Sequence, residues 1–212
     1  MNEGLTSDEA LTRLEEGNER FLAGKAQHPR LDRAHLLAAA RAGQHPFATV
    51  VGCSDSRCPV ELFFDMGVGD LFVIRVAGNV CDTDEIASIE YSTAYLAAPL
   101  VVVLGHTRCG AVTAAVEGGD VGGCIPRVLE QIAPAVSKAR MEHPGVEGEE
   151  LVDLAIRNNV WQVMENLFTG SPLVCRGVRA GEVRVLGGIL DIETGRVEWM
   201  GEHPLQAALS MH

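Results

Sequence analysis

The stretch Leu100-Val101-Val102-Val103-Leu104-Gly105, followed by His106-Thr107-Arg108-Cys109, decides the fold of this 212-residue chain. Its continuous apolar run is typical of a strand buried on both faces, as in the parallel sheets of α/β proteins. Residues 47–53 have the same character and end in Cys53-Ser54-Asp55-Ser56-Arg57. Open α/β sheets carry their chemistry at the carboxyl ends of strands, so we expect these two strand ends to form a site.

Helices and strands alternate around these two runs. Further strands are predicted at residues 70–76 and 173–178, and a hairpin over residues 183–192 and 196–199. Helices are predicted at about residues 83–97, 110–117, 126–140 and 149–168. This order predicts an α/β fold with a mainly parallel central sheet, an antiparallel edge and flanking helices.

The N-terminal part is predicted to form a helical arm. Thr6 and Glu9 fit a capping box for a helix over residues 6–23, in which Asn18 interrupts the apolar stripe. A second helix is predicted from about Leu31 to Ala42. No strand follows either helix directly, so the arm lies either on another subunit or on its own domain.

Composition and charge narrow the class of protein. With 47% hydrophobic and 22% charged residues, the chain predicts one domain over residues 1–212, with the arm in 1–42 and an α/β core in 47–200. A net charge of -12 argues against nucleic acid and anionic membranes as partners. The start of the chain does not resemble a signal peptide, and six cysteines are too few for a disulfide scaffold, which predicts a cytoplasmic protein with reduced thiols.

Cys53, His106 and Cys109 are predicted to hold one zinc ion. Thiolate sulfur and imidazole nitrogen are the ligands that zinc prefers. The spacing His106-x-x-Cys109 lets two ligands reach one ion from a single turn, and Cys53 arrives from the other strand end. Three ligands leave the fourth position open, which is typical of a catalytic zinc rather than a structural one. A His-x-x-Cys by itself would more often be a core cysteine near a loop histidine. The second cysteine, Cys53 at a neighbouring strand end, is what favours a zinc site.

The remaining cysteines and histidines are expected to lie outside this site. Cys58 could serve only if the loop after Cys53 folded back. All four other cysteines are expected to be small buried or half-buried thiols: Cys58, Cys81, Cys124 and Cys175. No other histidine has a ligand-spaced partner, so all six are expected at the surface: His28, His35, His45, His143, His203 and His212.

Asp55 and Arg57 are predicted to act on the molecule bound at the open position of the zinc ion. They follow Cys53 by two and four residues, so an extended chain would point all three side chains to one side. The alternative is a surface ion pair of little energetic value. Two thiolates already cancel the charge of the zinc ion, so a hydroxide at the open position would make the site negative. This favours a functional role for Asp55 and Arg57. The positive charge of Arg57 can offset the negative charge of the hydroxide, and Asp55 can accept a hydrogen bond from it.

At these residues the chain resembles the β-class carbonic anhydrases, over about residues 5–200. The motifs are CSDSR at 53–57, FVIRVAGN at 72–79, IEY at 89–91 and GHTRCG at 105–110. The resemblance implies one zinc ion per chain and an Asp55–Arg57 pair. It also implies a homodimer or dimer of dimers with the active site near the interface. The implied reaction is the reversible hydration of carbon dioxide to bicarbonate and a proton.

The resemblance further implies substrate contacts for Gln44, Phe72, Tyr91 and Gly110. Gln44 matches a glutamine that in some members reaches the substrate across the interface, although a plain loop residue is an equal interpretation. Phe72 and Tyr91 match residues that form the apolar wall of the substrate pocket. Packing in the core explains both residues equally well. Gly110 closes the last motif, next to Cys109.

One subgroup of this family has an inhibitory bicarbonate site that includes a tryptophan. Val50 stands at that position here, which argues against this regulation and favours a structural role for Arg75.

Two other functions stay open at this point. One is hydrolysis of carbonyl sulfide or carbon disulfide at the same site, which a comparison of turnover on the three gases distinguishes. The other is a zinc-binding homologue without catalysis, against which Asp55 and Arg57 argue. A thiol redox protein is disfavoured because the chain has no Cys-x-x-Cys.

We predict that the hydration rate rises from neutral to alkaline pH. Two thiolate ligands neutralise the charge of the ion, so water at the open position should lose its proton less readily than at an all-histidine site. Stopped-flow hydration measured across this pH range tests the prediction, and a rate that stays flat contradicts it.

Overall fold

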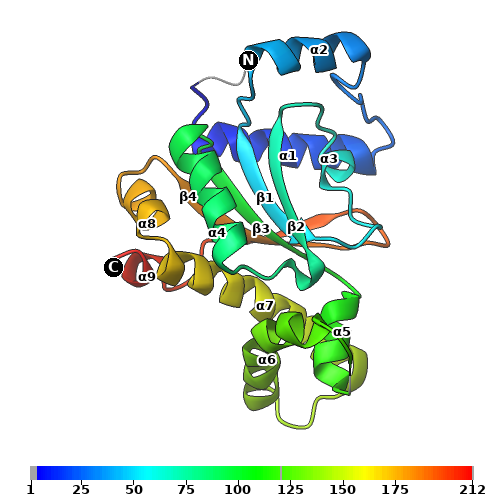
Figure 1. Ribbon diagram of the computed structural model, residues 1–212. Helices are drawn as coiled ribbons and strands as arrows, with labels where there is room; N and C mark the ends of the chain where they lie inside the picture. Colours follow the sequence, from blue (N-terminus) through cyan, green and yellow to red (C-terminus); the bar gives the residue numbers. More distant parts are fainter. Residues whose placement is uncertain (1–3, 120, 212) are drawn as a thin grey trace.

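The computed structural model describes residues 4–119 and 121–211, and in them a five-stranded sheet is flanked by helices (Figure 1). The strand order is β2-β1-β3-β4-β5. The first four strands run parallel, and β5 is antiparallel to β4, which confirms the predicted sheet with an antiparallel edge. The strand bounds are Ala48–Cys53 (β1), Leu71–Val76 (β2), Leu100–His106 (β3), Arg184–Leu190 (β4) and Val197–Gly201 (β5).

The helices largely follow the apolar periodicity of the sequence. Their bounds are Ser7–Leu22 (α1), Arg33–Ala42 (α2), Val60–Phe63 (α3), Thr83–Glu90 (α4), Gly110–Glu117 (α5), Ile125–Glu142 (α6), Gly148–Gly170 (α7), Pro172–Arg179 (α8) and Gln206–Leu209 (α9). The helix predicted over residues 83–97 is α4, which continues as a π-helical turn over Tyr91–Tyr95. No helix in the described part of the chain has the length and hydropathy that a membrane crossing requires.

The core lies on both faces of the sheet. β1 and β3 are buried along their whole length. Because side chains alternate along a strand, Val50 and Val102 pack in the layer that contains α1 and α3. Val51 and Val103 pack in the opposite layer, with α5, α6 and α7. The two strands that carry the expected ligands are therefore held from both sides.

The strand predicted at residues 173–178 is wrong, because this segment is helix α8. Ser171 caps the helix by accepting a hydrogen bond from the Val174 N–H, and Pro172 occupies its first turn. Only Val174 and Cys175 of the helix are buried. The apolar residues of this short segment fit the period of a strand as well as that of a helix, and the Ser171 cap favours the helix.

Two short helices were not predicted, and one histidine lies elsewhere than expected. α3 and α9 have four residues each, too short for a helical period to show. His203 was expected at the surface but is buried against the Trp161 ring, with Nε2 3.2 Å from Glu165 Oε1. Cys124 was expected to be buried or half-buried but is exposed. His212 lies outside the described residues.

The first arm helix is anchored to the domain, whereas the second is not buried anywhere. Gly17 of α1 approaches Phe64 so closely that a Cβ at Gly17 would lie 1.8 Å from the Phe64 carbonyl oxygen. In contrast, α2 has no buried residue, and Leu36 and Leu37 are exposed on it. Figure 1 shows α2 at the top, apart from the sheet.

Buried Asp65 ties the segment after α1 to the domain. Its carboxylate accepts hydrogen bonds from Arg20 Nε at 2.7 Å and from the N–H groups of Gln27 and His28. Burial alone would raise the pKa of Asp65, but these bonds outweigh it and lower the pKa. Asp65 therefore stays ionised at neutral pH and fixes the segment between α1 and α2.

Asn18, which interrupts the apolar stripe of α1, is a structural link. Its Nδ2 donates to the carbonyl oxygens of Phe63 at 3.0 Å and Gly195 at 2.8 Å. Its Oδ1 accepts from the Val197 N–H at 3.0 Å. One buried amide thus joins α1 to α3 and to the β4–β5 hairpin.

We predict that Asn18→Ala lowers the free energy of unfolding by about 3 kcal/mol, because three buried backbone groups lose their partner. Urea denaturation measures this loss. Glu16→Ala, at an exposed position on the same helix, is the control and should change the free energy by less than about 0.5 kcal/mol. Equal effects of the two substitutions would contradict the assignment.

Candidate metal centre

The structure brings the three predicted ligands together. Cys53 ends β1, His106 ends β3, and Cys109 immediately precedes α5. β1 and β3 are parallel neighbours with Gly52 opposite Leu104, so both strand ends meet at one edge of the sheet. The two sulfurs and one imidazole nitrogen lie within 4.8 Å of one another, and all three residues are buried. Among the described residues, no other group of three or more His, Cys, Asp or Glu side chains is arranged in this way.

His106 presents its Nε2 to the centre. Its Nδ1 lies 2.9 Å from the carbonyl oxygen of Thr107, to which it can donate only as N–H. The neutral tautomer with Nδ1–H leaves a lone pair on Nε2, which is buried and has no hydrogen-bond partner. Such an orphaned nitrogen between two sulfurs fits a metal ligand.

Cys109 stands at the N-cap position of α5. The neighbouring Cys53 sulfur and burial raise the pKa of its thiol, and the N–H groups of Val112 and Ala111 act in the opposite direction. N–H groups at a helix start favour a negative charge. The helix thus supports Cys109 as a thiolate once a cation is present.

Neighbouring groups lower the pKa of Cys53 and raise the pKa of His106. A hydrogen bond from Cys109 lowers the pKa of Cys53, helped by His106 and by backbone N–H groups. Burial lowers the pKa of His106, but the sulfurs of Cys53 and Cys58 outweigh it and raise the pKa to about 10. A metal ion that binds all three ligands must therefore displace protons from His106 and Cys109.

Asp55 and Arg57 form a two-bond ion pair beside the ligands. Arg57 Nε lies 2.9 Å from Asp55 Oδ1 and Arg57 Nη2 lies 2.7 Å from Oδ2. Arg57 Nη2 also donates to the carbonyl oxygen of Arg108 at 3.2 Å. Asp55 Oδ2 is 4.0 Å from His106 Nε2. Hydrogen bonds from Arg57 hold the pKa of Asp55 well below its usual range, so the carboxylate is ionised.

The expectation that the chain stays extended after Cys53 is wrong. It turns at Ser56 and Arg57, and the Arg57 N–H donates to Asp55 Oδ1 at 2.9 Å. The turn brings buried Cys58 close enough to raise the pKa of His106, although its sulfur is not part of the three-residue cluster. The turn, rather than strand alternation, brings Arg57 onto the Asp55 carboxylate.

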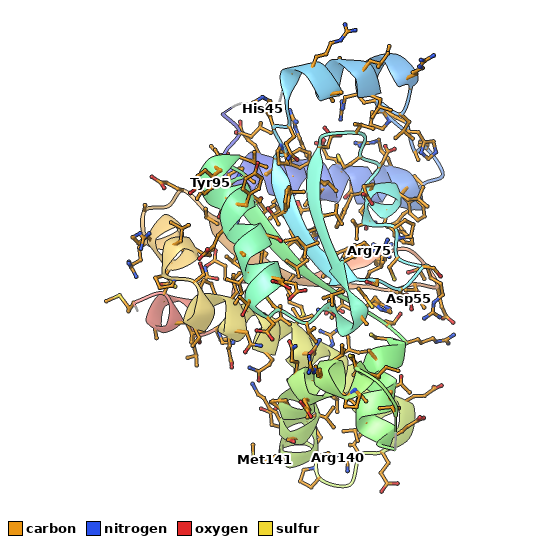
Figure 2. The ribbon with its side chains drawn as sticks, in the orientation of Figure 1. His45, Asp55, Arg75, Tyr95, Arg140 and Met141 are labelled. Carbon is orange, nitrogen blue, oxygen red and sulfur yellow. The ribbon has the colours of Figure 1, made fainter. Side chains whose placement is uncertain are left out.

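Arg75 has the structural role expected for it. Its guanidinium donates to the carbonyl oxygens of Cys53 at 2.9 Å and Asp55 at 2.5 Å. Asp55 and Arg75 lie near each other in Figure 2, at the opposite end of the sheet from His45. Arg75 thus holds the loop that carries Cys53 and Asp55.

Comparisons with known proteins agree with this donor set. Residues 48–197 match the family model for carbonic anhydrase. Over 187 residues the chain is 40% identical to carbonic anhydrase 2 of Mycobacterium tuberculosis, covering 86% of this chain and 87% of that protein. The structure of a β-carbonic anhydrase from Aspergillus fumigatus matches with a TM-score of 0.76 at 27% identity, over 94% of each chain.

The chain belongs to the β-class carbonic anhydrase family. Tetrameric β-carbonic anhydrases from Sordaria macrospora share the fold, with a TM-score of 0.73 at 27% identity, over 90% of this chain and 96% of theirs.

Of the substrate contacts predicted for this carbonic anhydrase, only Gly110 lies at the cluster of its own chain. Gly110 follows Cys109 as the first residue of α5, and a Cβ at that position would meet no atom within 4 Å. Phe72 pairs with Thr49, four residues before Cys53 and so about 13 Å along the strand. The Phe72 and Tyr91 ring centroids lie 6.2 Å apart.

Gln44 lies even farther from the cluster of its own chain. It precedes β1, whereas Cys53 ends that strand. It lines a surface hollow together with residues of α2 and with Val68 and Gly69. A contact between Gln44 and substrate therefore requires a second copy of the chain.

Sequence reasoning missed the backbone groups that support the ligands of this carbonic anhydrase. The Gly78 N–H donates to Cys53 Sγ at 3.3 Å, and the Thr107 carbonyl orients His106. In the sequence, Gly78 stands out only as part of the motif FVIRVAGN at 72–79. Its sequence signal is weak, because glycine commonly occupies loops for many reasons.

Proposed function

We propose that this carbonic anhydrase holds one zinc ion with Cys53, His106 and Cys109 and hydrates carbon dioxide reversibly to bicarbonate and a proton. The observation that carries the proposal is the buried sulfur–nitrogen–sulfur set, with its atoms within 4.8 Å of one another. This donor set suits zinc, and a set of three leaves a position for water or substrate.

When bound, the zinc ion would act as a Lewis acid that lets water lose a proton far more readily than free water does. Asp55 is ionised and 4.0 Å from His106 Nε2, so it accepts a hydrogen bond and orients the nucleophile toward the carbon of the substrate. Arg57 keeps Asp55 in place through two hydrogen bonds. Its positive charge also offsets the negative charge that develops as bicarbonate forms.

The substrate contacts proposed for the remaining residues involve two chains. Gly110 leaves open space beside Cys109 for a small molecule. Gln44, Phe72 and Tyr91 would line the pocket from a partner chain. The distance of Gln44 and Phe72 from the cluster supports this assignment, because their side chains cannot span it within one chain, and the Tyr91 ring lies beside the Phe72 ring.

We also propose that the functional unit is a homodimer or a dimer of dimers. Three features support a partner on this side of the sheet: α2 has no buried residue, Tyr95 is exposed, and β2 is an edge strand. Within this unit, residues 1–42 would serve as the arm and residues 47–200 as the core of a single domain. The six free thiols support the cytoplasm as compartment, which cell fractionation tests.

Cys53→Ser and Asp55→Asn separate metal binding from catalysis. Cys53→Ser is expected to lose zinc, because it removes a thiolate ligand. Asp55→Asn is expected to keep zinc and to lower the hydration rate by about 100-fold or more, because the carboxylate acceptor is lost. Metal analysis and stopped-flow hydration measure both effects. Retention of the parent rate by either variant, or a parent protein without zinc, would refute the proposed function.

The double substitution of Leu36 and Leu37 to Glu is expected to reduce the oligomer to smaller species. Burying two added charges in an interface is unfavourable, whereas on a free surface the charges cost little. Sedimentation velocity measures the change. Met141→Glu, at an exposed methionine at the other end of the molecule (Figure 2), is the control. An unchanged oligomer in the α2 variant would show that α2 does not lie in an interface.

A further inference from the structure

Gly78 lies between β2 and α4 and supports Cys53 through its backbone. Its N–H donates to Cys53 Sγ at 3.3 Å. This contact requires a left-handed backbone, with φ 72° and ψ 11°. A Cβ at Gly78 would lie 2.7 Å from Ile132 Cδ1 and 3.2 Å from Ala111 Cβ. Position 78 therefore needs glycine for conformation and for space.

The residue after Gly78 is also left-handed, which makes the turn unusual. Asn79 has φ 43° and is buried. Two consecutive residues in this region are seldom stable without outside contacts. The packing around the turn must therefore hold it in place.

Asn159 provides that contact from α7. Its Nδ2 donates to the carbonyl oxygen of Gly78 at 2.9 Å. Asn159 is 1% exposed, and every other buried residue of α7 is apolar. Its Oδ1 is also buried and has no hydrogen-bond partner. A half-satisfied amide at this position destabilises the helix packing, so its one hydrogen bond points to a role outside packing.

We propose that Asn159 is a positioning residue for the metal centre, acting through Gly78 on Cys53. Asn159 holds the carbonyl side of Gly78, and the amide side then points at the sulfur. The N–H stabilises the negative charge of the Cys53 thiolate and fixes the direction of the sulfur. Such outer contacts set both the affinity of a metal site and the electron density of its ligands.

Asn159→Leu tests this inference, because leucine has a similar size and cannot donate. The zinc dissociation constant, measured by competition with a chelator, is expected to rise about tenfold or more. In protein loaded with Co²⁺ instead, the thiolate-to-metal charge-transfer band is expected to move to longer wavelength, because the sulfur loses a hydrogen-bond donor and becomes more electron-rich.

Asn158→Leu is the matched control on the same helix. Asn158 is half-buried and donates to Glu142 Oε2 at 3.3 Å, away from the Gly78 turn. Its substitution should leave the zinc affinity and the Co²⁺ band unchanged. A change of equal size in both variants would mean a general packing effect and would overturn the inference.

Asn159→Ala is the second variant, in case leucine prevents folding, and circular dichroism checks the fold of each protein. Parent-like zinc affinity and an unshifted Co²⁺ band in a folded Asn159 variant would overturn the inference. The inference rests on the proposed ligand set, but the two fail differently. A parent protein that binds no zinc refutes the ligand set, whereas a zinc-binding parent with indifferent Asn159 variants refutes only the role of Asn159.

Discussion

Cys53 and His106 meet because β1 and β3 are parallel neighbours, with Gly52 opposite Leu104. Both strands are buried on both faces. A slip by one residue would turn every side chain to the wrong face, so the packing of both layers fixes the register. The chain then turns directly from β3 into α5, which places Cys109 beside the other two ligands. The metal centre is thus a consequence of strand pairing.

Burying two thiols that must become thiolates creates an electrostatic problem, and the backbone solves part of it. The start of α5 directs N–H groups at Cys109, and Gly78 directs one at Cys53. The Thr107 carbonyl selects the tautomer of His106 that leaves Nε2 free. These groups belong to rigid elements and need no rearrangement. A cation that enters the cluster replaces protons and completes the charge balance.

The residues proposed to contact the ion and the substrate lie at two ends of the molecule that a single chain does not bring together. The metal cluster and the Asp55–Arg57 pair lie at the carboxyl ends of β1 and β3, whereas Gln44 and α2 lie at the opposite end. The strands between the two ends are lined with buried valines, so the ends cannot move closer together within one chain. The proposed oligomer follows from this separation, because an antiparallel arrangement of two chains would place the arm end of one beside the metal end of the other.

The sequence by itself determined the two buried strands, their reactive ends and most helices, because apolar periodicity and ligand spacing are local properties. It also pointed to Cys53, His106 and Cys109 through residue type. It failed for residues 173–178, where a short apolar segment fits either period, and for the turn that brings Arg57 back to Asp55. Only the tertiary structure decided that Asn18 links three elements and that Asn159 reaches Gly78, 81 positions away in the sequence. Such contacts join residues far apart in the chain, and no local pattern encodes which backbone group a buried amide will find.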